Sequence, residues 1–60
     1  MYEVRWTCMI NGKDGLDEYD NEDKAYKAFD DIKESRGIEN VGLYYIDGDG
    51  AEKELMVWAR

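Results

Sequence analysis

The sequence predicts an α+β fold with two layers and element order ββαββ, in which a four-stranded, mainly antiparallel sheet has one helix packed on one face. Three observations support this fold class. Residues 2–10 alternate between apolar and polar types, residues 21–36 place apolar side chains at helical spacing, and residues 41–59 hold two more strand-like segments around a glycine-rich turn. No linker or repeat interrupts this pattern, so we expect one small domain over residues 1–60.

The first strand is predicted at residues 2–10, where the even positions are apolar and the odd positions are mostly polar. Such a period of two is typical of a half-buried strand, so the even positions should face the core. Cys8 is one of these even positions, and we interpret it as a small buried apolar side chain and not as a reactive thiol.

A turn and a short edge strand are predicted next. Residues 11–15 are rich in Asn, Asp and Gly, which tolerate positive φ, so the chain should reverse there and continue as a strand over residues 16–19. The charged Asp17 and Glu18 indicate the edge of the sheet, because charges discourage pairing with other chains. The register stays open, since a five-residue loop would point Leu16 into the core and a four-residue loop would point Tyr19 there.

A helix is predicted over residues 21–36. Asp20 is expected to cap its amino end, and acidic residues in the first turn suit the positive end of the helix dipole. After the basic Lys33 and Arg36 of the last turn, Gly37 should end the helix in the left-handed conformation. The apolar face that would rest on the sheet consists of Ala25, Ala28, Phe29 and Ile32.

The last two strands are predicted at residues 41–46 and 52–59, joined by a loop of three or five residues with a left-handed glycine. An odd loop keeps the apolar residues of both strands in one row, whereas an even loop would mix a glutamate into that row. The predicted pairs are Val41 with Val57, Leu43 with Leu55, and Tyr45 with Lys53.

One helix covers only one face of a four-stranded sheet, so the other face should meet solvent or a partner. We expect the covered face to hold Val4, Trp6, Cys8, Val41, Leu43, Leu55 and Val57. The opposite face would then expose a contiguous apolar patch, which we interpret as a protein interface because aromatic residues and Met are enriched where proteins meet. The alternative is an ordinary surface, since apolar atoms are common on any protein. The predicted interface residues are Arg5, Met9, Tyr44, Ile46, Met56 and Trp58.

The chain has 15 acidic and 8 basic residues and a formal charge of -7, and this charge is unevenly placed. Residues 14–23 hold six acids and no base, and these form a predicted acidic pole of Asp14, Asp17, Glu18, Asp20, Glu22 and Asp23. A second acidic group surrounds the last turn, with Asp47, Asp49, Glu52 and Glu54. The acids either only solvate the domain or imitate a phosphate backbone and occupy a basic groove. Direct binding of nucleic acid is not expected, because this charge would repel phosphates.

Several chemistries are not expected from this composition. Without His there is no catalytic triad, no Cys-His dyad and no imidazole metal ligand. Residues 47–50 resemble part of a calcium loop, but Ala51 and Glu52 follow where a calcium-binding loop needs an oxygen ligand and a glycine. We therefore expect no metal, no cofactor and no catalytic residue, because so small a domain hardly forms a catalytic cleft. One cysteine excludes an internal disulfide, and no apolar run has the length of a membrane span, so we expect a cytoplasmic protein that does not bind membranes.

In size, acidity and layout, the whole chain resembles the small inhibitors that phages and mobile elements encode against host nucleic-acid enzymes, such as anti-restriction, anti-CRISPR and uracil-glycosylase inhibitor proteins. The resemblance rests on general character and on no motif. It implies a non-catalytic protein-binding module that mimics nucleic acid and binds a basic nucleic-acid-binding protein. The alternative hypothesis is a homodimeric structural or regulatory protein, in which two bare sheet faces pack together and the acids keep the protein in solution.

Overall fold

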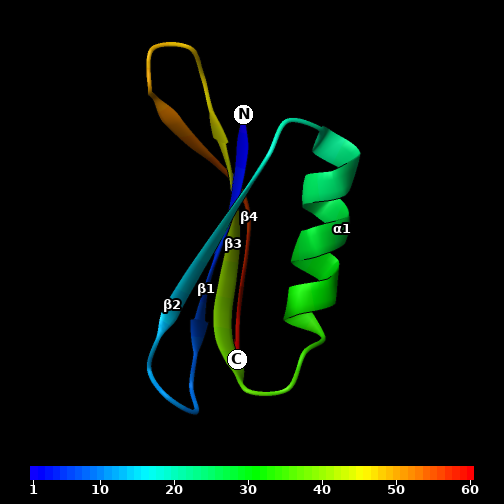
Figure 1. Cartoon of the computed structure of the whole chain (residues 1–60), viewed down its shortest axis with the longest axis vertical. Helices are drawn as coiled ribbons and strands as arrows, with labels where there is room; N and C mark the ends of the chain where they lie inside the picture. Colours follow the sequence, from blue (N-terminus) through cyan, green and yellow to red (C-terminus); the bar gives the residue numbers. More distant parts are fainter.

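A computed structural model describes all 60 residues and confirms the predicted ββαββ order in two layers (Figure 1). The elements are β1 (Tyr2–Cys8), β2 (Asp14–Tyr19), α1 (Glu22–Lys33), β3 (Ile38–Ile46) and β4 (Glu52–Ala59). The strands form one sheet in the order β2-β1-β3-β4, and every neighbouring pair is antiparallel. The two hairpins therefore lie side by side, joined along β1 and β3.

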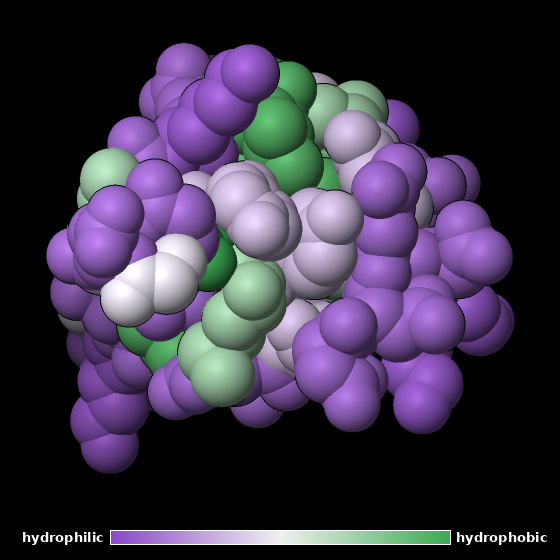
Figure 2. All heavy atoms as spheres, turned by 90° about the horizontal axis from the view of Figure 1, so that it is seen from above, coloured by the Kyte–Doolittle hydropathy of each residue, from purple (hydrophilic) through white to green (hydrophobic).

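The core lies between α1 and the two central strands. Ala25 and Phe29, one helical turn apart on α1, are buried against side chains of β1 and β3. The buried apolar residues are Val4, Ala25, Phe29, Ile38, Val41 and Leu43. Seen from one end of the molecule, apolar atoms show in the middle and hydrophilic side chains surround them (Figure 2).

The helix is shorter than predicted at both ends. Its N-cap is Asn21 and not Asp20, because the Asn21 side-chain oxygen accepts a hydrogen bond from the backbone N–H of Lys24 at 3.1 Å. The helix ends at Lys33, so the predicted boundary at Arg36 is wrong. Ser35 N–H donates to the carbonyl oxygen of Ile32, three residues back, and this tighter turn closes the helix before the left-handed Gly37.

The first hairpin is regular, and its register decides the alternative that the sequence left open. The backbone N–H of Cys8 donates to the carbonyl oxygen of Lys13 at 2.8 Å, which leaves the four residues 9–12 in the turn. Tyr19 therefore lies on the core side, opposite Tyr2, and Leu16 lies on the other face and is 49% exposed. The strand predicted over residues 2–10 ends at Cys8, so Ile10 is 80% exposed in the turn instead of facing the core.

The second hairpin contains a β-bulge, which makes part of the predicted pairing wrong. Its loop has five residues, 47–51, which is one of the two predicted lengths, and Tyr45 lies opposite Lys53 as predicted. The register then shifts at Leu55, so that Val41 lies opposite Trp58 and no longer opposite Val57. Leu55 and Trp58 both pack on the core, and a regular strand cannot do this because residues three apart point to opposite faces.

The bulge exchanges the faces predicted for the end of β4. Val57 was expected in the core, but it lies opposite Gly42 on the face away from α1 and is 55% exposed. Met56 and Trp58 were expected on that uncovered face, but they lie opposite Leu43 and Val41, whose side chains are buried beneath the helix. The apolar patch predicted for the uncovered face is therefore smaller than the sequence indicated.

Candidate protein-binding face

The sheet face turned away from α1, called the open face below, is covered by no other element (Figure 1). Its residues follow from the register, because Val4 is buried on the helix side and neighbours along a strand alternate between faces. The open face consists of Asp14, Leu16 and Glu18 of β2, Glu3, Arg5 and Thr7 of β1, Asn40, Gly42, Tyr44 and Ile46 of β3, and Glu52, Glu54, Val57 and Ala59 of β4. It therefore holds five carboxylates and one basic side chain.

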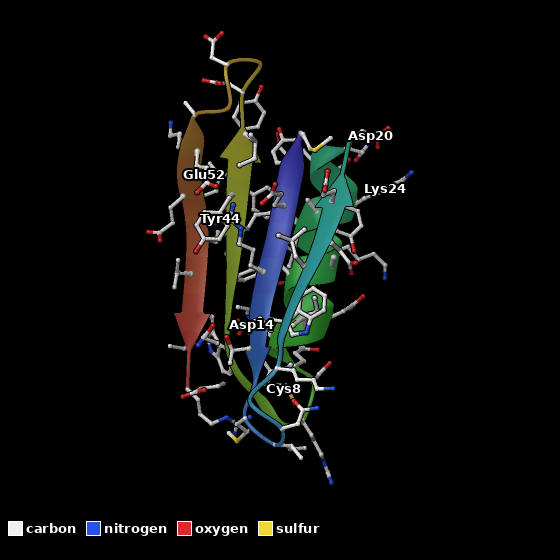
Figure 3. All side chains as sticks on the ribbon, turned by 60° about the vertical axis from the view of Figure 1, so that its left-hand side comes forward. Cys8, Asp14, Asp20, Lys24, Tyr44 and Glu52 are labelled. Carbon is white, nitrogen blue, oxygen red and sulfur yellow. The ribbon has the colours of Figure 1, made fainter.

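Arg5 lies between two of these carboxylates. Its Nη2 lies 2.6 Å from Glu3 Oε1 and 2.5 Å from Glu52 Oε1, and its Nη1 donates to Glu52 Oε2 at 3.3 Å. The guanidinium carbon is 4.4 Å from the centre of the Tyr44 ring, within the range of a cation–π contact. Figure 3 shows Tyr44 and Glu52 close together on this face. One side chain of β1 thus links β3 and β4 across the sheet.

The pKa values of this cluster shift in the directions expected for paired charges. Hydrogen bonds from Arg5 lower the pKa of the Glu52 carboxyl, and hydrogen bonds to Glu52 and Glu3 raise the pKa of Arg5. The Arg5 side chain is 32% exposed, so solvent screens these interactions in part. Arg5 remains charged and is engaged within the chain, and it offers little free positive charge to a partner.

Gly42 occupies the centre of the open face for a steric reason. A Cβ at this position would lie 2.7 Å from the Tyr44 hydroxyl oxygen, so any other residue would displace the Tyr44 ring. The ring leans over Gly42 and meets the Arg5 guanidinium from there. The glycine therefore sets the position of the aromatic partner of Arg5.

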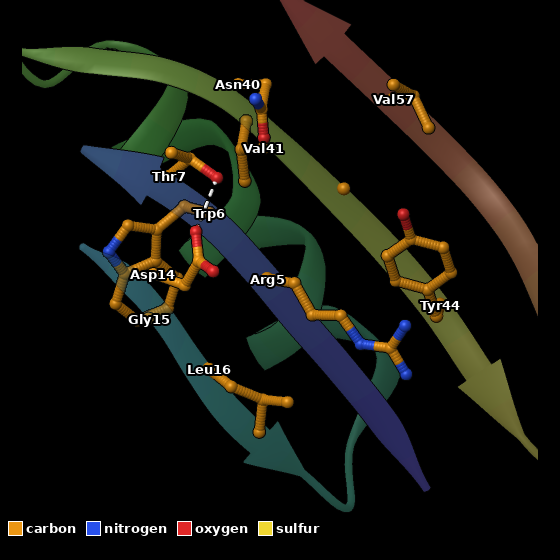
Figure 4. Close-up of a pocket in the computed structure, with 11 residues that line it drawn as sticks. Arg5, Trp6, Thr7, Asp14, Gly15, Leu16, Asn40, Val41, Tyr44 and Val57 are labelled. Atoms are coloured by element: carbon orange, nitrogen blue, oxygen red, sulfur yellow. Dashed lines mark hydrogen bonds between the residues drawn. The ribbon is translucent and has the colours of Figure 1, made fainter. Parts of the chain in front are cut away.

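A hollow of about 420 Å³, called the Gly42 hollow below, lies beside this cluster (Figure 4). The Arg5 guanidinium points toward Glu3 and Glu52, and Gly42 has no side chain, so neither residue fills the space between β1 and β3. The hollow is lined by Arg5, Trp6, Thr7, Asp14, Gly15, Leu16, Asn40, Val41, Gly42, Tyr44 and Val57.

Polar atoms lie at one end of the Gly42 hollow, and apolar side chains form its walls. Thr7 Oγ1 donates to Asp14 Oδ1 at 2.8 Å, which holds that carboxylate at the rim (Figure 4). Neither the Asn40 side-chain amide nor the Tyr44 hydroxyl has a hydrogen-bond partner within the chain. The exposed apolar side chains at the hollow are Leu16 and Val57. The hollow thus offers unused hydrogen-bonding groups next to apolar surface.

Three of the six predicted interface residues lie on the open face, namely Arg5, Tyr44 and Ile46. Met9 lies in the first turn, where its backbone N–H donates to the Gly37 carbonyl at 2.7 Å, so its placement on a strand was wrong. Met56 and Trp58 lie on the helix side for the reason given above. The sequence reasoning missed Leu16, Asn40 and Val57, because two of them depend on a hairpin register and the third precedes the predicted start of β3.

The predicted acidic pole does not form one surface. Asp14 and Glu18 lie on the open face, but Asp17 lies between them in sequence and points to the opposite side of β2. Asp14 and Asp20 lie near opposite ends of β2 (Figure 3). Glu22 and Asp23 belong to the first turn of α1. The carboxylates that share a surface come instead from three strands, β2, β1 and β4.

Two tyrosines show how the remaining acids act locally. Tyr2 donates a hydrogen bond to Glu22 at 3.2 Å, and burial together with this carboxylate raises the pKa of Tyr2. Burial and the charge of Asp17 raise the pKa of Tyr19 in the same way. Asp47 accepts hydrogen bonds from the backbone N–H groups of Asp49 and Ala51, so its role is to shape the last loop.

No protein-family model, curated protein or solved structure matches the chain. The functional interpretation therefore rests on the geometry of the open face. The structure contains no group of three or more His, Cys, Asp or Glu side chains placed to hold a metal ion. Its helix has 12 residues and is neither long nor apolar enough to cross a membrane.

Proposed function

We propose that this chain is a non-catalytic protein-binding module that inhibits a nucleic-acid-binding protein by occupying its basic surface. One observation carries the proposal: the open face holds five carboxylates and an unfilled hollow, and its single basic side chain is engaged by two of these carboxylates. A surface with this charge is complementary to the basic groove that a nucleic acid would occupy.

The strand pairing supports a role for this charge beyond solvation. Glu3 and Glu18 lie directly opposite each other on neighbouring strands, an arrangement of like charges that destabilises a sheet. Glu18 and Glu54 have no salt bridge within the chain, whereas Glu3 and Glu52 share Arg5. A basic partner would compensate the charges that the fold leaves unpaired.

A homodimer through the open face is the second candidate, and the exposure of Leu16 and Val57 favours it. The charge of the face argues against it, because two copies packed face to face would bring ten carboxylates together with two basic side chains, twice the number on one face. Like charges that face each other across an interface repel and weaken binding. We therefore favour a foreign basic partner.

The test compares two double variants that each remove two negative charges. Glu18→Gln with Glu54→Gln changes the open face, and Asp17→Asn with Glu34→Gln changes the helix side of β2 and the end of α1. Immobilised wild-type protein is used to isolate a basic partner, which is then purified and studied directly. We expect the open-face variant to associate more slowly with this partner and the control variant to bind as wild type does.

Two further measurements decide between the candidates. DNA or RNA should compete with the chain for the purified partner, and association should slow steeply as salt increases, because charge steering is screened beyond about 8 Å at physiological ionic strength. Equal binding by both double variants, or binding that nucleic acid does not disturb, would contradict the proposal. A concentration-dependent dimer in sedimentation experiments would instead favour the homodimer.

A further inference from the structure

The Gly42 hollow has a shape and chemistry that restrict what it can accept from a partner. Its floor lies between β1 and β3 beside Gly42, over which the Tyr44 ring leans, and its exposed apolar side chains are Leu16 on β2 and Val57 on β4. Both side chains are about half exposed, at 49% and 55%, so they offer apolar surface that an incoming side chain would cover. An occupant therefore needs an extended apolar portion.

The polar end of the hollow favours a hydrogen-bond donor with positive charge. Thr7 engages one oxygen of Asp14, Oδ1, and the second oxygen makes no hydrogen bond within the chain. The Asn40 amide and the Tyr44 hydroxyl are also free to bond. Asp14 and the net negative charge of the open face would repel an anionic occupant, whereas a cation would find charge complementarity.

An arginine side chain combines these properties. Its three methylene groups can lie on apolar surface while its planar guanidinium donates several hydrogen bonds in fixed directions. The chain itself shows the same mode of recognition on the same face, where the Arg5 guanidinium is bound by two carboxylates and packs against Tyr44. Lysine offers a point charge and cannot bond Asp14 and Asn40 with a planar fork.

We infer that the Gly42 hollow is the anchor site of the open face and accepts one arginine side chain of the partner, its stem on the apolar surface of the hollow and its guanidinium at Asp14 and Asn40. This inference rests on the proposed function, because it specifies how a basic protein would be held. It makes the hollow an interface hot spot, while the outer carboxylates steer the approach.

The experiment uses isotope-labelled full-length protein and three short blocked peptides, Gly-X-Gly with X as arginine, citrulline or lysine. Citrulline has nearly the shape of arginine but no charge. We expect the arginine peptide to shift the NMR signals of Thr7, Gly42 and the Asn40 side-chain amide, with the citrulline peptide binding roughly 10-fold more weakly, as for loss of a charge-assisted hydrogen bond. The lysine peptide should bind more weakly than the arginine peptide.

A matched pair of variants tests the site itself. Asp14→Asn keeps an oxygen that can accept the Thr7 hydrogen bond but removes the charge at the hollow, whereas Asp17→Asn removes the same charge from the other side of β2. We expect Asp14→Asn to weaken the binding of the arginine peptide roughly 3- to 10-fold and Asp17→Asn to leave this binding unchanged. Asn40→Leu, which leaves the charge unchanged, should also weaken it.

Several outcomes would overturn the inference. Equal affinity for the arginine and citrulline peptides, equal effects of the two aspartate variants, or signal shifts spread along all acidic residues would each do so. Shifts at the hollow that depend on protein concentration without peptide would assign it to a second copy of the chain. If the partner is captured through Glu18 and Glu54 while the peptide does not reach the hollow, this inference fails and the proposed function stands. If the arginine peptide binds at the hollow but no partner is found for which nucleic acid competes, the inference about the hollow stands and the proposed function fails.

Discussion

Different interactions stabilise the two faces of the sheet. Beneath α1, Val4, Val41 and Leu43 are at most 1% exposed and pack under Phe29, so this face is stabilised by burial of apolar surface. On the open face the central side chain of β1 is Arg5, whose partners remain accessible to water. Most of the stability therefore resides on the covered face, while the open face keeps a hollow and a carboxylate, Glu18, that stability does not require.

The largest expected effect lies on the covered face. Phe29→Ala should reduce the free energy of unfolding by about 3–5 kcal/mol, because it removes the largest fully buried side chain and leaves a cavity. For a domain of this size that loss is most of the total. Urea denaturation measures it, and a loss of less than about 1 kcal/mol would contradict the packing described here.

The next prediction tests the bulge that decides which residues of β4 belong to each face. Trp58→Ala should cost roughly 2–3 kcal/mol, because its half-buried ring packs on the core, whereas Val57→Ala should stay within about 0.5 kcal/mol. Denaturation of both variants under the same conditions gives the comparison. A larger loss of stability in Val57→Ala than in Trp58→Ala would instead indicate a regular strand in which Val57 is buried.

A smaller effect is expected when the charge cluster of the open face is broken. Arg5→Met keeps much of the side-chain volume but leaves Glu3 and Glu52 without their cation, so the unfolding midpoint should fall by less than in Trp58→Ala. Added salt should reduce the difference between wild type and Arg5→Met. A difference that salt does not change would indicate that the stem of Arg5 matters more than its charge.

The same cluster predicts a dependence on pH. The folded state lowers the pKa of Glu52 below its ordinary value of 4.5, so its contribution is present above that pH and is lost as the pH falls through the lower folded pKa. Wild type should therefore be more stable than Glu52→Gln at neutral pH, and the two should converge in acid. Thermal unfolding between pH 3 and pH 7 measures the difference, and a constant difference over that range would refute the prediction.

The smallest predicted effect has the opposite sign. Glu18→Gln removes a like charge that faces Glu3 across the β1–β2 pair, so the domain should gain roughly 0.2–0.5 kcal/mol. The matched Asp17→Asn variant should not show this gain, because Asp17 lies opposite the apolar Val4. A stabilising change that also slows binding would separate the function of the open face from its folding.

The fold could be predicted from the sequence because its signals are local. The alternation along β1, the acidic first turn of α1 and the parity of the last loop each depend on neighbouring residues, and the structure confirms the elements that they predict. The bulge at Leu55 could not be predicted in this way. No glycine marks it, and it arises because Leu55 and Trp58 both reach the core, which is a property of the assembled fold.

The candidate site was predictable only in outline. An uncovered face containing Arg5 and Tyr44 follows from having one helix and four strands. The pairing of Arg5 with Glu52 joins residues 47 positions apart, and it requires the order of the strands and the register of two pairs. The prediction of one acidic pole was wrong for a related reason, since consecutive acids along one strand alternate between its two faces.

The central pairing of β1 with β3 has a consequence for how the protein folds. Each hairpin forms from nearby residues, but a lone hairpin is marginal in water, and Tyr2 must find Tyr45 before the central strands can share a core. We expect this long-range docking, with α1 as the connecting segment, to limit the folding rate and to make unfolding all-or-none. Arg5 of the first hairpin and Glu52 of the second meet only after the two hairpins have docked. Cleavage of the chain between β2 and α1 should therefore prevent the open face from assembling, even if both hairpins remain in solution.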